Sequence, residues 1–352
     1  MSHQTRGGAA VPRVLDIHAH LLSPEVYERT RAHSLFARMA EDADAPEEQR
    51  RALRARAERV EHNMAEAEER VARMDAMGVG IQVLSASLVH QSTDFADPDT
   101  ALALERRHND RLAGIVAARP DRFLGLGGVP LQAPALAVAE LERCMGALRL
   151  HGVGISTRAG GREIGDPALH PFWAKAAELG AVVYVHPAGN QDERLRKFQL
   201  WNSLGQSMEE AFAIASLIYE GVLERFPGLK ICIAHGGGYM PYNTGRVDRN
   251  YEEKPATRVN MRRPPAEYLR MLSYDTCVYD GRTLEALVAK VGAERVILGS
   301  DYPVGEMRPV EFVTSAPGLS AEQKGRILWN NAAALFGLPG AAEGGSGAPP
   351  PA

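Results

Sequence analysis

The sequence predicts an α/β fold, a distorted TIM (β/α)8 barrel with a helical insertion after the first strand. Two observations lead to this class. Eight short runs of β-branched and apolar residues recur along the chain, and each leads into a stretch with helical periodicity. The runs are also continuously apolar, as expected of parallel strands that are covered on both faces. Eight such units favour a closed barrel over an open sheet.

The strands follow one another at regular intervals, although two of them carry weaker signals. FLGLGGV is rich in glycine, and LSYDT is short of apolar residues. The eight candidate strands are RVLDI (13–17), IQVLS (81–85), FLGLGGV (123–129), VGIST (153–157), VVYVH (182–186), KICIAH (230–235), LSYDT (272–276) and VILGS (296–300).

One connection is far longer than a single strand-to-helix crossover requires. Residues 21–80 are rich in Glu, Arg, Ala and Met, which favours helix. We therefore predict a helical insertion at about 23–75 that lies over the barrel mouth, with its dense charge on a solvated face. The predicted organisation is a flexible N-terminus (1–11), one metal-dependent barrel domain (12–338) and a disordered tail (339–352) rich in Gly, Pro and Ala.

Composition narrows the possible partners and the compartment. The chain has 352 residues with 40 Lys+Arg against 44 Asp+Glu, a net charge of -4. This offers no basic field, so we expect no nucleic-acid partner. We find no secretory signal and no apolar run of membrane-spanning length, and therefore expect no membrane partner. The three cysteines are widely spaced and form no CxxC pair, which favours a reduced, cytoplasmic protein.

Candidate metal ligands lie where the predicted strands end. His18 and His20 end the first strand, on the same side of an extended backbone. His186 and His235 close two later strands, and Asp301 follows the last one. The carboxyl ends of barrel strands meet at the active-site face, so these side chains are expected to converge. A hydrogen-bonded or core histidine could explain any one of them, but not the whole pattern.

Imidazole and carboxylate ligands suit Zn, Mn, Fe or Co, and three or four of them leave a coordination position open for water or substrate. The end of the fourth strand offers no Lys, Glu or Cys that could bridge two ions. We therefore predict one catalytic divalent ion and no organic cofactor.

Several longer motifs resemble one known family, the amidohydrolase superfamily, in its aminocarboxymuconate-semialdehyde decarboxylase-like branch. The resemblance extends from Leu15 to about Leu338. Its motifs are LDIHAH (15–20), RMDAMGV (73–79), HPFWAKAAELG (170–180), VYVHP (183–187), FPGLKICIAHGGG (226–238), GRVDRNY (245–251), RRPPAEYL (262–269) and LGSDYP (298–303).

The resemblance implies roles for individual residues. His18, His20, His186 and Asp301 would be the metal ligands, with Asp301 also catalytic, and His235 would be the acid/base beside the ion. The HxH form of the first motif, in place of ExH, makes Zn2+ the first choice, with Mn2+ possible. The implied activity is non-oxidative decarboxylation of a small aromatic or muconate-like carboxylic acid. The alternative is hydrolysis of an ester, lactone or amide on the same site.

Substrate contacts are a further expectation. Arg246 occupies the position from which a family member supplies an arginine to the substrate of a neighbouring subunit, so a homodimer or higher oligomer is implied. Pairing of Arg246 with Asp248 or a helix end is the alternative. Trp201, Phe198 and Tyr239 are candidates to wall an aromatic substrate. The family's second substrate arginine comes from the insertion, where this chain departs from the pattern.

Overall fold

The computed structural model describes residues 12–34 and 46–339. Residues 1–11 and the tail beyond Pro339 lie outside this part, so the flexibility expected of the first and the disorder expected of the second remain predictions. No helix in the two described ranges has the length and apolar character that a membrane crossing requires.

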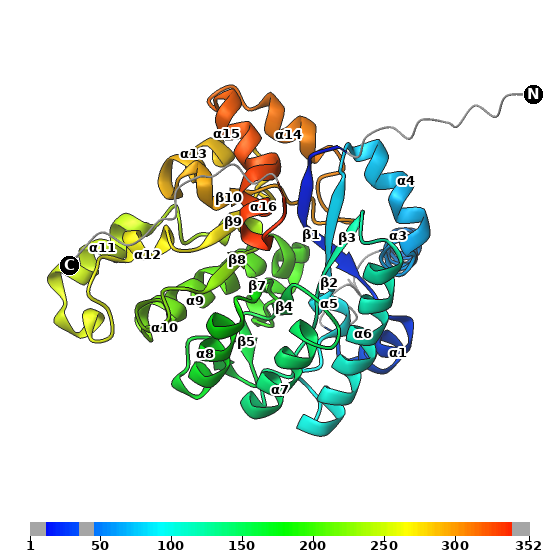
Figure 1. The fold of residues 1–352 in the computed structure, drawn as a ribbon, viewed down its shortest axis with the longest axis horizontal. Helices are drawn as coiled ribbons and strands as arrows, with labels where there is room; N and C mark the ends of the chain where they lie inside the picture. Colours follow the sequence, from blue (N-terminus) through cyan, green and yellow to red (C-terminus); the bar gives the residue numbers. More distant parts are fainter. Residues whose placement is uncertain (1–11, 35–45, 340–352) are drawn as a thin grey trace, which may run out of the picture.

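Parallel strands form the centre of the molecule, with helices around them (Figure 1). Hydrogen bonding gives one sheet of order β1-β2-β3 and another of order β10-β9-β8-β7-β4. Two single parallel bridges, Gly127 to Val153 and Ala19 to Tyr302, join the sheets at both edges. The eight parallel strands of the described residues thus close into a ring. The bounds are β1 (Leu15–Leu21), β2 (Ile81–Ala86), β3 (Phe123–Leu126), β4 (Gly152–Ile155), β7 (Val182–Val185), β8 (Lys230–Ile233), β9 (Ser273–Asp275) and β10 (Val296–Ile297).

The predicted barrel is therefore confirmed, and each candidate strand overlaps an observed one. β10 is only two residues long, and each bridge at the two junctions is a single residue pair, which accounts for the distortion. A short hairpin of β5 (Arg158–Ala159) and β6 (Arg162–Glu163) follows β4.

Helices lie around the ring of strands. They are α5 (Leu88–Gln91), α6 (Pro98–Ala118), α7 (Pro134–Met145), α8 (His170–Leu179), α9 (Gln206–Tyr219), α10 (Val222–Arg225), α11 (Thr244–Glu253), α12 (Pro265–Leu269), α13 (Gly281–Val291), α14 (Pro309–Ser315), α15 (Ala321–Gly325) and α16 (Asn331–Phe336). The segment that contains α11 and α12 projects away from the barrel (Figure 1).

Shorter turns of 3-10 or π-helix connect these elements. They are η2 (Pro167–Leu169), η3 (Glu193–Leu195), η4 (Lys197–Gln199), η5 (Trp201–Gly205), η6 (His235–Gly237), η7 (Pro255–Arg258), η8 (Ala293–Arg295) and η9 (Arg326–Asn330).

The described parts of the insertion between β1 and β2 are helical, as predicted, and residues 35–45 lie outside the described residues. It contains α1 (Pro24–Thr30), η1 (Arg31–His33), α3 (Glu47–Ala65) and α4 (Ala67–Met77). The buried guanidinium of Arg70 on α4 donates hydrogen bonds to the carbonyl oxygens of His20 (2.6 Å) and Met64 (3.1 Å). Because Met64 lies in the last turn of α3, Arg70 holds this helix against the strand that carries the HxH pair.

Alternation along the strands divides the core into two layers. On β7, Val182 and Tyr184 belong to one buried cluster, whereas Val183 and Val185 belong to the other. The same alternation separates Cys232 on β8 from its neighbours. Successive strand side chains point to opposite faces, so the smaller cluster fills the barrel and the larger one packs strands against helices. This packing fixes the strand ends, where the functional side chains lie.

Candidate metal centre and active site

Four side chains from three strand ends converge at the barrel mouth. They are His18 and His20 on β1, His186 directly after β7, and Asp301 shortly after β10, all buried. Each offers one ligand atom, and these atoms lie within 4.8 Å of one another. Asp301 Oδ1 is 2.9 Å from His20 Nε2 and 3.2 Å from His18 Nε2. The structure thus brings together four of the five residues that the strand-end pattern singled out.

Hydrogen bonds from behind orient two of the imidazoles. Asp275, the last residue of β9, lies with Oδ2 2.7 Å from His18 Nδ1, and this oxygen also accepts a bond from the Tyr184 hydroxyl. Its Oδ1 accepts from the backbone nitrogens of Gly236 and Cys277. His186 Nδ1 lies 2.8 Å from the Pro187 carbonyl oxygen. The Nε2 atoms of His18 and His186 are therefore left to face the centre, an arrangement typical of metal-ligating histidines.

The donor set fits one divalent cation. Buried polar atoms normally find partners, but His18 Nε2 and His20 Nδ1 form no hydrogen bond with a described residue. Burial favours the protonated form of Asp301, yet His18 and the other imidazoles outweigh this and hold the pKa of the carboxyl well below its usual value. Burial and the neighbouring imidazoles hold the pKa of His186 well below its usual value. An ionised carboxylate and a neutral imidazole are the forms that bind metals.

His235 lies beside these ligands in a strained backbone position, with φ of 48°. Its Nε2 is 3.8 Å from Asp301 Oδ2, and its Nδ1 is bonded to the Glu210 carboxylate of α9. Burial lowers the pKa of His235, but Glu210, with help from Asp301, more than offsets this and holds the pKa well above its usual value. The pairing with Glu210 thus favours the imidazolium form of His235, which could donate a proton from Nε2.

Glycines allow this pair to form. A Cβ on Gly238, which has φ of 58°, would lie 2.2 Å from the Ser207 carbonyl oxygen and 2.8 Å from Glu210 Oε2. The glycine run after His235 thus lets α9 approach the strand end closely.

Replacing Glu210 by Gln should shift the pH dependence of activity. The acid form of His235 is present below its pKa and is lost as pH rises through it. Because Glu210 raises that pKa, E210Q should move the high-pH limb of a kcat profile down by about 1 to 2 pH units. The matched control is E209Q, since Glu209 bonds Thr157 and Asn190 instead. An unchanged limb in E210Q would show that Glu210 does not set the pKa of His235.

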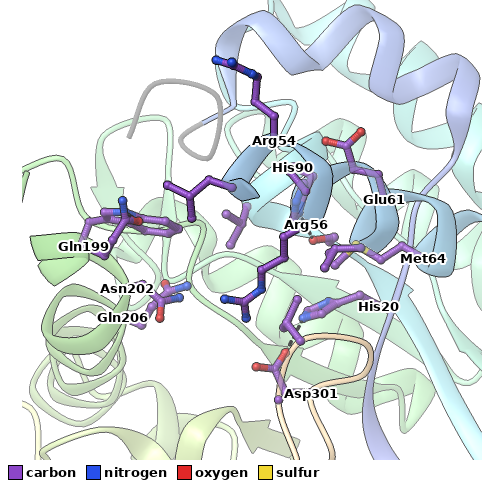
Figure 2. A pocket seen from close by; sticks show the side chains of 18 of the residues that line it. His20, Arg54, Arg56, Glu61, Met64, His90, Gln199, Asn202, Gln206 and Asp301 are labelled. Carbon is purple, nitrogen blue, oxygen red and sulfur yellow. Dashed lines mark hydrogen bonds and ion pairs between the residues drawn. The ribbon is translucent and has the colours of Figure 1, made fainter. Parts of the chain in front are cut away.

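The centre forms the floor of a cavity of about 1030 Å³. Helix α3 crosses over it, and the Arg56 side chain extends from this helix into the space between Asp301 and Gln206 (Figure 2). Trp201 and His90 also line the cavity. The His90 ring is buried, and its Nδ1 lies 2.7 Å from the Ser87 hydroxyl oxygen.

The predicted substrate contacts are only partly brought to this cavity. Trp201 lines it, with its indole nitrogen bonded to Gln199. Phe198 does not, because its left-handed backbone (φ of 60°) turns the ring outward, where it is 84% exposed. Tyr239 and Arg246 are also exposed and lie outside the lining. In a single chain Phe198, Tyr239 and Arg246 therefore lie outside the cavity lining, and their contact with the substrate stays a prediction. Asp248 accepts a bond from the Ala266 nitrogen and forms no ion pair with Arg246 among the described residues.

Comparison with known proteins identifies the family to which this barrel and its metal centre belong. The model of the amidohydrolase family described as "Amidohydrolase" matches residues 15–338. The chain belongs to the amidohydrolase family. The match covers the whole barrel, including every residue of the metal centre, so the resemblance drawn from the sequence motifs is confirmed.

Similar amidohydrolases include decarboxylases. A 2-amino-3-carboxymuconate-6-semialdehyde decarboxylase of Dictyostelium discoideum is 34% identical over 79% of this chain and 79% of its own length. The crystal structure of 5-carboxyvanillate decarboxylase from Sphingomonas paucimobilis superposes with a TM-score of 0.80 and 28% identity, over 94% of this chain and 100% of that one. A dihydroxybenzoic acid decarboxylase from Polaromonas sp., solved with bound manganese, has a TM-score of 0.77 at 23% identity, over 93% and 97% of the two chains.

Proposed function

We propose that this amidohydrolase is a metal-dependent, non-oxidative decarboxylase of a small aromatic or unsaturated carboxylic acid. The observation that carries the proposal is the pairing of His235 with Glu210 beside the convergent donor set, on the floor of the cavity. The decarboxylase activities of its relatives support the same reaction.

The residues divide the work between binding and proton transfer. A divalent ion held by His18, His20, His186 and Asp301 would supply Lewis-acid polarisation of a substrate oxygen. His235 donates its Nε2 proton to the carbon that bears the carboxylate. The bond between that carbon and the carboxylate then breaks, CO2 leaves, and the bonding electrons restore the conjugated system. Glu210 stabilises the imidazolium before transfer, and His235 regains its proton from water afterwards.

For the ion itself we propose Zn2+ first and Mn2+ second. Three imidazoles and one carboxylate form the nitrogen-rich set that zinc favours in catalytic sites. The bound manganese of the Polaromonas relative supports the second choice. Both ions accept the same ligands, so the preference concerns geometry and availability more than donor type.

Arg56 is our candidate for binding the substrate carboxylate. Its neighbours Arg50 and Arg54 on α3 both pair with Glu47, whereas Arg56 forms no ion pair with a described residue and points into the cavity (Figure 2). A guanidinium matches a carboxylate through two parallel hydrogen bonds. Arg56 could thus bind the carboxylate of the substrate above the metal centre. The ring of the substrate would then lie between Trp201 and the floor of the cavity.

Substitution of Arg56 by Met should weaken substrate binding. A lost hydrogen bond to a charged group costs about 1.5–3 kcal/mol, so KM should rise roughly 10- to 100-fold with a much smaller change in kcat. Arg59 lies on the same helix but outside the lining, and R59M serves as the control. If R56M and R59M gave the same KM as the wild type, Arg56 would not bind the carboxylate.

We also propose that the active form is a homodimer or higher oligomer in the cytoplasm. Arg246 on α11 is exposed and lies outside the lining of the cavity above the metal centre, which supports a role at the site of a second copy. The three buried, unpaired cysteines suit a reducing compartment. Light scattering tests the assembly: full activity in a monomer would exclude a contribution of Arg246 to a neighbouring site.

The proposed reaction is tested by its products. Protein loaded with Zn2+ or Mn2+ is incubated with hydroxybenzoates, muconate-type acids, lactones and simple esters, and CO2 is measured alongside ring opening and ester cleavage. We expect CO2 from at least one aromatic or unsaturated acid. Ring opening or ester cleavage without any CO2 would assign the site to a hydrolase.

A further inference from the structure

Three successive strand ends carry a non-glycine residue in the left-handed backbone region. His235 follows β8, Tyr279 follows β9 and Asp301 follows β10, with φ of 48°, 55° and 57°. Such conformations persist only where the surroundings fix them, and they are concentrated at active sites. His235 and Asp301 already have roles in the proposed reaction. Tyr279 is the member of this series whose role is unassigned.

Tyr279 contacts the metal centre through its hydroxyl group. The hydroxyl donates a hydrogen bond of 3.1 Å to Asp301 Oδ2, and the residue lines the cavity although it is 55% exposed. The other carboxylate oxygen, Oδ1, faces His18 and His20. The two oxygens of Asp301 therefore have separate partners: imidazole nitrogens on one side and a phenol on the other.

The loop after Asp301 is shaped around this contact. Gly305 donates a backbone hydrogen bond to the Asp301 carbonyl oxygen, which brings the chain back over the carboxylate. A Cβ at Gly305 would lie 2.8 Å from the Tyr279 hydroxyl oxygen and 2.6 Å from Asp301 Cβ. A side chain there would collide with both groups, so the absence of one leaves room for the hydroxyl group to reach Oδ2.

Occupation of Oδ2 matters because two other groups could compete for it. His235 Nε2 is 3.8 Å away, close enough to move into a hydrogen bond if the phenol were missing. A metal ion on Oδ1 could also take Oδ2 as a second ligand from the same carboxylate. Either change would alter the ion's coordination or remove the proton of His235 from the substrate.

We propose that Tyr279 is a positioning residue that holds Oδ2 of Asp301, so that only Oδ1 serves the metal ion and His235 stays directed at the substrate. This inference rests on the proposed metal site. It gives the hydroxyl group a task that is separate from binding the substrate and from proton transfer.

The test uses Co2+ as a visible probe of coordination, without substrate. The absorption of Co2+ weakens as its coordination number rises, so it reports whether Asp301 binds through one oxygen or two. Wild-type protein, Y279F and Y279N are stripped of metal and titrated with Co2+. Asn tolerates the left-handed backbone better than other non-glycine residues, so Y279N removes the phenol without added strain. The control is Y242F, because Tyr242 is similarly exposed and bonds the Thr283 carbonyl instead.

We expect every variant to bind one Co2+, with weaker absorption in Y279F and Y279N than in the wild type and Y242F. Steady-state kinetics should show a kcat lower by about 10-fold in Y279F with KM little changed, in the range found for partners of metal ligands. If Y279F had the Co2+ spectrum and the kcat of the wild type, the proposal for Tyr279 would be overturned, whereas the metal site would stand. Failure of both Tyr279 variants to fold would also overturn it, since the hydroxyl would then be structural. A wild-type protein that binds no Co2+ would instead contradict the metal site itself.

Discussion

Replacement of His235 by Asn should reduce kcat by about 10²- to 10⁴-fold, the range that a single general acid or base contributes. Asn is close to His in size and keeps a polar group near Asp301, so the metal content and the thermal unfolding temperature should change little. The loss follows from the missing imidazole, because His235 is the group proposed to donate the proton to the substrate. Initial rates of CO2 formation with the metal-loaded variant measure it.

A matched histidine controls for the substitution itself. His170 begins α8 beside Phe226 and Arg225 and does not line the cavity. H170N should therefore retain the wild-type rate. If H235N kept its activity while its metal content was intact, His235 would not be the proton donor and the proposed mechanism would be wrong.

Replacement of His186 by Ala should remove both the ion and the activity. Even the loss of a partner that only orients a ligand commonly costs 10–100-fold in metal affinity, so the loss of a ligand should cost at least about 100-fold. After dialysis against metal-free buffer, H186A should contain far less than one ion per chain, and added Zn2+ or Mn2+ should restore little activity.

His90 provides the control for the metal analysis, because it lines the same cavity without belonging to the convergent group. H90Q should keep one ion per chain. Stoichiometric metal in H186A would show that the ion is held elsewhere, and the four-residue site would have to be abandoned.

Much of this architecture could be predicted because it depends on local pattern. Continuous apolar runs locate the parallel strands, and chain direction in a barrel brings their carboxyl ends to one face. His18, His20, His186, His235 and Asp301 all occupy such ends, so their proximity follows from the register of the sequence. The position of α3 over the cavity likewise follows from a connection too long for one crossover.

Other parts of the site depend on packing that no local pattern records. Glu210 lies in SMEEAF, where the charge would normally face solvent, and it is buried because Gly238 lets α9 come close. Asp275 lies in LSYDT, one of the two candidate strands with weaker signals. Phe198 was expected in the cavity as an aromatic residue, but a left-handed turn points it outward. Tyr279 resembles any surface tyrosine until its hydroxyl group is seen on Asp301.

Deuterium incorporation is the most direct test of the central claim, that the protonated His235 beside the metal centre replaces a carboxylate by hydrogen. The metal-loaded protein is allowed to convert its acid substrate in D2O, and the product is analysed by mass spectrometry and NMR. The account predicts a product that has lost CO2 and carries one solvent deuteron on the carbon that bore the carboxylate. A product that retains its carboxylate and has gained the elements of water would contradict it.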